Sequence, residues 1–270
     1  MSSDSLLTAL GGVANALFLI VGVYIYVSLI RQISARAPAS TNGSTRIFGL
    51  PEAILAVGLV FLLLLGVVAS LSHPSIQLNS RDLVENLLFT LGVVLVVITF
   101  LQFRGFDLNF LGGFAKLSFF RALSTGTILM LAAYPLISVA DAITQRLLGS
   151  GSSKQSIVEL FNASQTISQR IMIIVFAVAI APVAEEFLFR FFLYGVLKRY
   201  FGRLLGLTAN ALLFAAVHTH LPSFVPLFVL GSCFTIAYEW SGSILVSMTM
   251  HALFNSVSLA LLAFPELFPQ

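Results

Sequence analysis

The chain contains little charge and almost no cysteine. Only 9% of its 270 residues are charged, whereas ordinary soluble domains carry roughly 25%. The single cysteine, Cys233, excludes an internal disulfide and any metal cluster built from cysteine. The formal net charge is only +3 and the basic residues are spread along the sequence, which argues against a nucleic-acid partner. Because 58% of the residues are hydrophobic and the mean hydropathy is +1.00, the composition indicates a membrane protein with several spans.

Long polar stretches are also lacking. The longest, near residues 31–50 and 145–170, are too short to bury a core, which excludes a soluble domain of useful size. A spanning helix needs about 20 apolar residues, and windows of that kind predict an all-α polytopic membrane helix bundle with about eight transmembrane helices. We expect these helices near residues 6–30, 52–72, 83–103, 118–143, 170–200, 204–219, 223–239 and 243–263.

Two further expectations concern the parts between and around these helices. Residues 155–168 are compatible with a short amphipathic helix at the membrane surface and equally with a loop. Most of the 14 Lys and Arg residues fall on one side of the membrane if the N-terminus lies outside. Since basic loops favour the cytoplasmic side, we expect both termini outside, in a multi-pass protein of a prokaryotic plasma membrane.

One apolar segment nevertheless carries three charged side chains. It reads IMIIVFAVAIAPVAEEFLFRFFLYGVL and contains Glu185, Glu186 and Arg190, while His218 and His251 follow in separate apolar segments. A charge at the centre of a bilayer costs at least ~2.5–3.5 kcal/mol on insertion scales, so these groups require partners and suggest a function. An acid near imidazoles in a sheltered site is typical of proton-transfer chemistry on water.

The spacing of these residues repeats the interval of one helical turn. The patterns are E-E-x-x-x-R at 185–190, F-x-x-x-H at 214–218 and H-x-x-x-N at 251–255, and residues four apart share one face of a helix. Glu186 and Arg190 are therefore expected to form an ion pair, with the neighbouring acid pointing elsewhere. Phe214 is expected to form a packing wall beside the histidine that follows it.

Depth in the membrane supports a shared site. Counting from a basic turn near Phe201 and Gly202, Glu185 and His218 both stand ~24 Å deep at ~1.5 Å per residue. His251 lies ~15 Å from the next turn by the same rise, so it can reach them only if helices tilt or kink. Pro182, just before the acids, is a predicted kink point because it lacks a backbone donor.

The three patterns, in this order, resemble the signature of the CPBP family, the CAAX-protease and bacteriocin-processing (Abi) intramembrane peptidases. Their eukaryotic relative is the type II CAAX prenyl endopeptidase. The resemblance covers about residues 182–255, with APVAEEFLFR, FAAVH and HALFN, and departs from it at Phe191, where bacterial members usually have glycine. We therefore divide a single integral membrane domain into N-terminal helices of unassigned role, 1–150, and a catalytic membrane core, 151–270.

The resemblance implies an intramembrane endopeptidase. Its substrate would be a hydrophobic or membrane-associated peptide or protein in the lipid bilayer. Glu185 and His218 would activate water for attack on the peptide carbonyl, His251 and Asn255 would hold the developing oxyanion, and the expected ion pair would support them. Donors aimed at an oxyanion in a dry pocket are worth several kcal/mol, which agrees with this assignment.

Other interpretations remain open. One glutamate and two histidines could form a zinc site with an open position for water, held by Glu185, His218 and His251. The sequence lacks H-E-x-x-H, however, so we assign no cofactor and treat zinc as the less favoured alternative. The buried groups could instead relay protons in a transporter, although such proteins typically show internal repeats and here one half has almost no buried charge. A non-catalytic membrane partner or immunity protein on the same scaffold is the third possibility.

Overall fold

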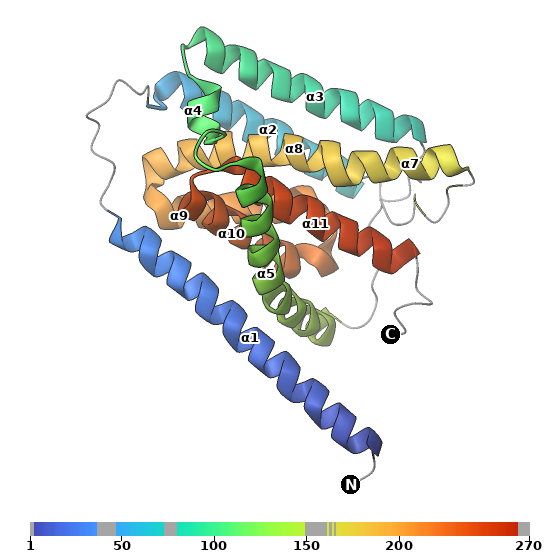
Figure 1. The fold of residues 1–270 in the computed structure, drawn as a ribbon. Coiled ribbons are helices and arrows are strands. Elements are labelled where there is room, and N and C mark those ends of the chain that lie inside the picture. Colours follow the sequence, from blue (N-terminus) through green and yellow to red (C-terminus); the bar gives the residue numbers. More distant parts are fainter. Residues whose placement is uncertain are drawn as a thin grey trace.

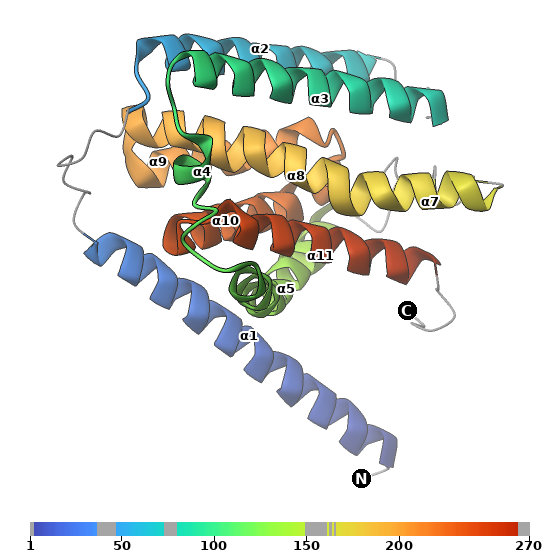
Figure 2. The same cartoon turned by 45° about the horizontal axis from the view of Figure 1, so that its top comes forward.

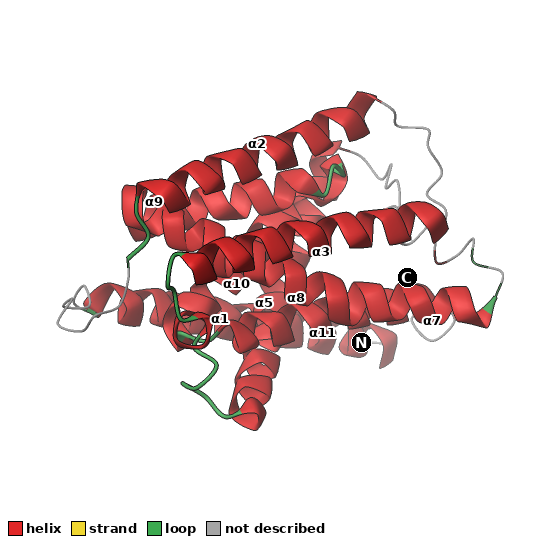
Figure 3. Ribbon diagram, turned by 90° about the horizontal axis from the view of Figure 1, so that it is seen from above, coloured by secondary structure: helices red, strands yellow, loops and turns green. Residues whose placement is uncertain are grey.

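A computed structural model describes residues 3–36, 47–72, 80–148, 161, 164 and 166–263. Within these ranges the chain is helical and contains no strand, which confirms the all-α prediction (Figure 3). In chain order the elements are α1 (Ser3–Ala35), α2 (Leu50–Ser72), α3 (Ser80–Phe103), α4 (Leu108–Gly112), α5 (Phe119–Leu148), α7 (Ile167–Val175), the π-helix η1 (Phe176–Ile180), α8 (Ala181–Glu186), the π-helix η2 (Phe187–Leu193), α9 (Tyr194–Val217), the 3₁₀ turn η3 (Leu221–Ser223), α10 (Phe224–Ser241) and α11 (Ile244–Ala263).

Seven helical stretches of the described chain are long and apolar enough to cross a membrane. One of them, Ile167–Val217, has 51 residues and contains Gly202 in a left-handed conformation with φ 79°. The chain reverses there, since a Cβ on Gly206 would lie 2.8 Å from the backbone nitrogen of Lys198 on the arm before the turn. The predicted turn near residues 201–202 is thus present, and the expectation of about eight membrane helices is confirmed.

The helices are arranged in layers (Figures 1 and 2). The hairpin of α2 and α3 lies on one side of the α7–α9 segment, and α10, α11 and α5 lie on its other side. Helix α1 packs on α5 and α10 at the far face. The segment with the two acids is therefore enclosed between the α2–α3 hairpin and the layer that contains α11.

Aromatic side chains fill the centre of the bundle around η2. Phe192, Phe214 and Phe234 are completely buried. Phe191, the residue that departs from the family pattern, stacks on Phe187 at a centroid distance of 4.9 Å and meets Phe48 edge-on at 6.5 Å. The phenylalanine thus takes part in an aromatic cluster next to the charged residues.

Residues 155–168, for which a surface helix and a loop were both open, lie mostly outside the described residues. The description resumes at Thr166, which begins α7 with a capping box. The hydroxyl of Thr166 accepts a hydrogen bond from the backbone N–H of Gln169, and the side chain of Gln169 accepts one from the backbone N–H of Thr166. The fifth membrane helix therefore begins at Ile167, three residues before the predicted start.

Candidate active site

The two acids lie on a short α-helix between two π-helical segments. Helix α8, Ala181–Glu186, follows η1 and precedes η2. π-helical turns inside α-helices are rare and occur frequently at functional sites. Pro182 stands in the first turn of α8, directly after η1. The predicted kink at Pro182 thus takes the form of a change from α-helical to π-helical geometry over the five residues of η1.

The π-helix and the proline together leave one backbone carbonyl without a donor from its own helix. The N–H of Ala181 bonds to the carbonyl of Phe176, and Pro182 has no N–H to offer the carbonyl of Ala177. The side-chain amide of Asn255 on α11 supplies the donor, with its Nδ2 2.7 Å from that oxygen. Asn255 therefore connects α11 to η1, and this contact could not be read from the H-x-x-x-N spacing.

Glu186 and Arg190 form the expected ion pair. Arg190 Nη1 lies 3.0 Å from Glu186 Oε1, and neither side chain is exposed. The guanidinium also lies over aromatic rings, with its Cζ 4.2 Å from the centroid of Phe214 and 5.1 Å from that of Phe234. A desolvated cation–π contact stabilises by about 2 kcal/mol or more, so the rings and the carboxylate together hold this buried cation. Phe234 was not identified from the sequence, because an aromatic residue in an apolar helix carries no distinguishing signal.

His251 lies between the two acids. Its Nδ1 is 2.9 Å from Glu186 Oε1, and its Nε2 is 3.8 Å from Glu185 Oε2. Because a carboxylate only accepts hydrogen bonds, Nδ1 carries the proton and donates to Glu186. The sequence allowed His251 to approach Glu185 only if helices tilt or kink. The helix that carries the acids is distorted by the π-helical segments on either side of α8, and His251 does lie close to Glu185.

His218 is oriented by its own helix. It caps the C-terminus of α9, and its Nδ1 donates to the backbone carbonyl of Phe214 at 2.6 Å. In the neutral ring this leaves Nε2 as a hydrogen-bond acceptor. The Phe214 ring contacts both imidazoles, at centroid distances of 4.8 Å for His218 and 5.7 Å for His251. Phe214 is thus the expected packing wall, shared by both histidines.

Glu185 differs from its neighbour in exposure and in bonding. Its side chain is 28% exposed, whereas that of Glu186 is fully buried. Its Oε2 is buried and accepts no hydrogen bond within the described part of the chain. Oε2 of Glu186 is likewise buried and accepts no hydrogen bond there, so it is the greater exposure of Glu185 that leaves this acid accessible to a water molecule or a substrate.

One strained residue follows His218 directly. Thr219 has φ 52°, and it is the only residue other than glycine with a positive φ in the described ranges. Its Oγ1 accepts a hydrogen bond from the Ser70 hydroxyl on α2 at 3.2 Å. A β-branched residue in this conformation is a genuine outlier, and such strain clusters at functional sites. No pattern in the sequence signals this contact between the α2–α3 hairpin and the end of α9.

The donors do not fit a zinc site as they are arranged. Within the described residues, no three His, Cys, Asp or Glu side chains are grouped so that they could hold a metal ion. Glu185 Oε2 lies 3.8 Å from His251 Nε2, but together with His218 these side chains do not form such a group. We therefore assign no step to a metal.

Comparison with known protein families gives a match in the C-terminal half of the chain. Residues 167–257 match the protein family described as "Type II CAAX prenyl endopeptidase Rce1-like". The matched stretch runs from the start of α7 into α11 and contains all three polar patterns. No curated protein and no solved structure matches the chain.

Proposed function

We propose that this chain, whose residues 167–257 belong to the CPBP family of CAAX-type proteases, is an intramembrane endopeptidase. Its substrate is a hydrophobic or membrane-associated peptide or protein, reached from the bilayer. The observation that carries the proposal is the arrangement around Glu185, which is partly exposed and whose Oε2 lies 3.8 Å from His251 Nε2 and accepts no hydrogen bond from the described residues. The ion pair with Arg190 holds Glu186 in place, and contacts with the Phe214 ring hold both histidines.

In the proposed reaction, Glu185 is the general base and His218 orients the water through its Nε2. Glu185 removes a proton from water while the water oxygen bonds to the peptide carbonyl carbon, which gives a tetrahedral oxyanion. The proton held by Glu185 then passes to the amide nitrogen, the C–N bond breaks, and the products are a carboxylic acid and an amine. General-base catalysis of this kind contributes typically 10²–10⁴-fold.

His251 and Asn255 are the proposed oxyanion donors. His251 already uses its Nδ1 proton on Glu186, so donation from Nε2 requires the doubly protonated ring, for which Glu186 is the adjacent counter-charge. Asn255 uses one amide N–H on the Ala177 carbonyl and retains a second. Arg190 in turn compensates the charge of Glu186 and supports the histidine through it.

The experiment compares wild type with Glu185→Gln in detergent. A library of peptides with apolar segments is incubated with each protein, and new termini are identified by mass spectrometry. We expect Glu185→Gln to reduce cleavage at least about a hundredfold. The matched control is Glu85→Gln on α3, an exposed acid outside the site, which should cleave like wild type. Retained cleavage in Glu185→Gln would refute the assignment, and proton flux in vesicles without cleavage would favour the transporter.

A further inference from the structure

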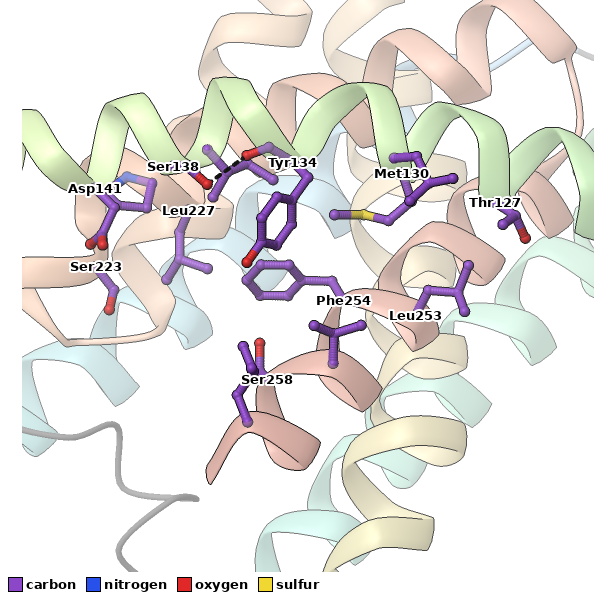
Figure 4. A pocket seen from close by; sticks show the side chains of 15 residues that line it. Thr127, Met130, Tyr134, Ser138, Asp141, Ser223, Leu227, Leu253, Phe254 and Ser258 are labelled. Carbon is purple, nitrogen blue, oxygen red and sulfur yellow. Dashed lines mark hydrogen bonds between the residues drawn. The ribbon is translucent and has the colours of Figure 1, made fainter. Parts of the chain in front are cut away.

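A cavity lies on another side of α11 from the proposed active site. It is a partly open groove bounded by α5, the start of α10 with η3, and the second half of α11, and its volume is about 340 Å³ (Figure 4). This is near the lower end of the ~300–1,000 Å³ that is typical of small-molecule sites. The walls are mainly apolar, with Met130, Leu227, Leu253 and Phe254 among them.

This cavity is distinct from the proposed active site. Helix α11 directs His251 to α8 and Asn255 to η1, whereas Leu253, Phe254 and Val257 line the cavity. None of the residues proposed for peptide hydrolysis contributes to its lining.

A close helix contact marks one end of the cavity. A Cβ on Gly126 of α5 would lie 2.6 Å from the Cβ of Thr249 on α11, so the two helices touch at that level. Directly beyond it the cavity follows α5 from Thr127 to Asp141 and α11 from Leu253 to Leu261. At 1.5 Å per residue, the path from Met130 to Asp141 is ~16 Å long. An elongated apolar space of this kind suits a hydrocarbon chain.

The other end of the cavity carries a carboxylate. Asp141 lies in the candidate span Phe119–Leu147, six residues from its end, which corresponds to ~9 Å of helix and to the depth near lipid head groups. Its Oδ2 accepts a hydrogen bond from the neutral side chain of Gln145 at 2.8 Å, and no cation of the described chain pairs with it. An acid in a membrane helix calls for a partner of opposite charge.

We propose that this cavity binds one hydrocarbon chain of a membrane lipid whose head group carries an ammonium, with Asp141 as its counter-charge. The apolar walls between Met130 and Leu253 hold the chain. Asp141 repels the phosphate of an anionic lipid but attracts an ammonium at the same depth. The proposal does not depend on the peptidase activity, because the two sites share no residue.

The test is native mass spectrometry of the full chain in detergent. It is titrated with phosphatidylethanolamine and, separately, with phosphatidylglycerol of identical acyl chains. We expect phosphatidylethanolamine to bind about fivefold more tightly, the effect of one charge near a membrane surface. Asp141→Asn, which retains the hydrogen bond from Gln145, should abolish this preference. Asp107→Asn in the loop before α4 is the matched control and should retain it.

A second variant tests the position of the chain. Ser258→Trp places a large side chain in the cavity and should reduce the binding of both lipids. If this variant does not fold, Val257→Phe fills the cavity with a smaller increase in side-chain size and should have the same effect. Equal binding of the two lipids by wild type would overturn the proposal, as would a preference that survives Asp141→Asn. Binding unchanged in both cavity-filling variants would place the lipid elsewhere. If a lysine-containing apolar peptide binds and neither lipid does, the occupant of the cavity is a peptide, and this result would also overturn the proposal.

Discussion

His251 and Glu186 are joined by a 2.9 Å hydrogen bond that connects α11 to the end of α8. The acceptor, Oε1 of Glu186, is also the atom that lies 3.0 Å from Arg190. One carboxylate oxygen thus serves a histidine and a guanidinium, both of them buried. Glu185, the more exposed of the two acids, makes no such ion pair with Arg190, which supports its proposed role as the general base.

Removing Arg190 should destabilise the protein. Arg190→Ala leaves Glu186 buried without its counter-charge, which costs about 3–5 kcal/mol in comparable cases. The double variant Glu186→Gln with Arg190→Gln should recover melting temperature relative to Arg190→Ala, because no uncompensated charge remains. Melting is measured in detergent for wild type, Arg190→Ala and the double variant. A wild-type melting temperature in Arg190→Ala would show that the aromatic rings and the ion pair contribute little.

The reductions in cleavage caused by removing His218 and by removing Glu185 should not multiply. If both act on the same water molecule, His218→Ala reduces cleavage nearly as much as Glu185→Ala, and the double variant is little worse than either single. The measurement is kcat/KM for one cleaved peptide in all four proteins, with circular dichroism to show that each is folded. Strictly multiplicative losses would show that the two residues act in separate steps.

Asn255 and Pro182 should be coupled in stability. Asn255→Ala leaves the buried carbonyl of Ala177 without a donor, at a cost of about 1–3 kcal/mol. Pro182→Ala gives residue 182 a backbone N–H, so the double variant should melt at a higher temperature than Asn255→Ala alone.

Cleavage by that double variant separates the two roles of Asn255. If the residue also binds the oxyanion, activity stays low although the melting temperature recovers. Recovery of both would limit Asn255 to its structural contact, and absence of any thermal recovery would contradict the assignment of its amide to the Ala177 carbonyl.

Chelators should not abolish activity. The donor groups of Glu185, His218 and His251 do not form a group that could hold a metal. We expect unchanged cleavage after treatment with 1,10-phenanthroline, with a zinc-dependent protease inhibited in the same assay as control. Inactivation that added zinc reverses would require the three side chains to move together.

Interactions within one helix could be predicted from the sequence, and interactions that depend on helix packing could not. The Glu186–Arg190 pair follows from their separation of four residues, and the turn at Gly202 follows from the apolar windows on either side. The bond from Asn255 to Ala177 depends on a π-helix, which no residue pattern reveals. Similarly, the cavity beside Asp141 depends on how α5 and α11 separate beyond Gly126, so the sequence left Asp141 without a role.

The π-helices η1 and η2 also have a consequence for the length of the chain near the acids. A π-helical turn holds one residue more than an α-helical turn, so deleting one residue within Phe176–Ile180 would restore α-helical geometry there. Each residue of an α-helix corresponds to a rotation of about 100°, and α7 would turn by that amount relative to Glu185 and Glu186. A single insertion or deletion within η1, or in the part of η2 that follows Arg190, therefore changes which face of the flanking helix meets its neighbours, while the E-E-x-x-x-R motif itself stays intact. Variation in length at these two places offers a way to reshape the surroundings of the site without substituting any of its polar residues.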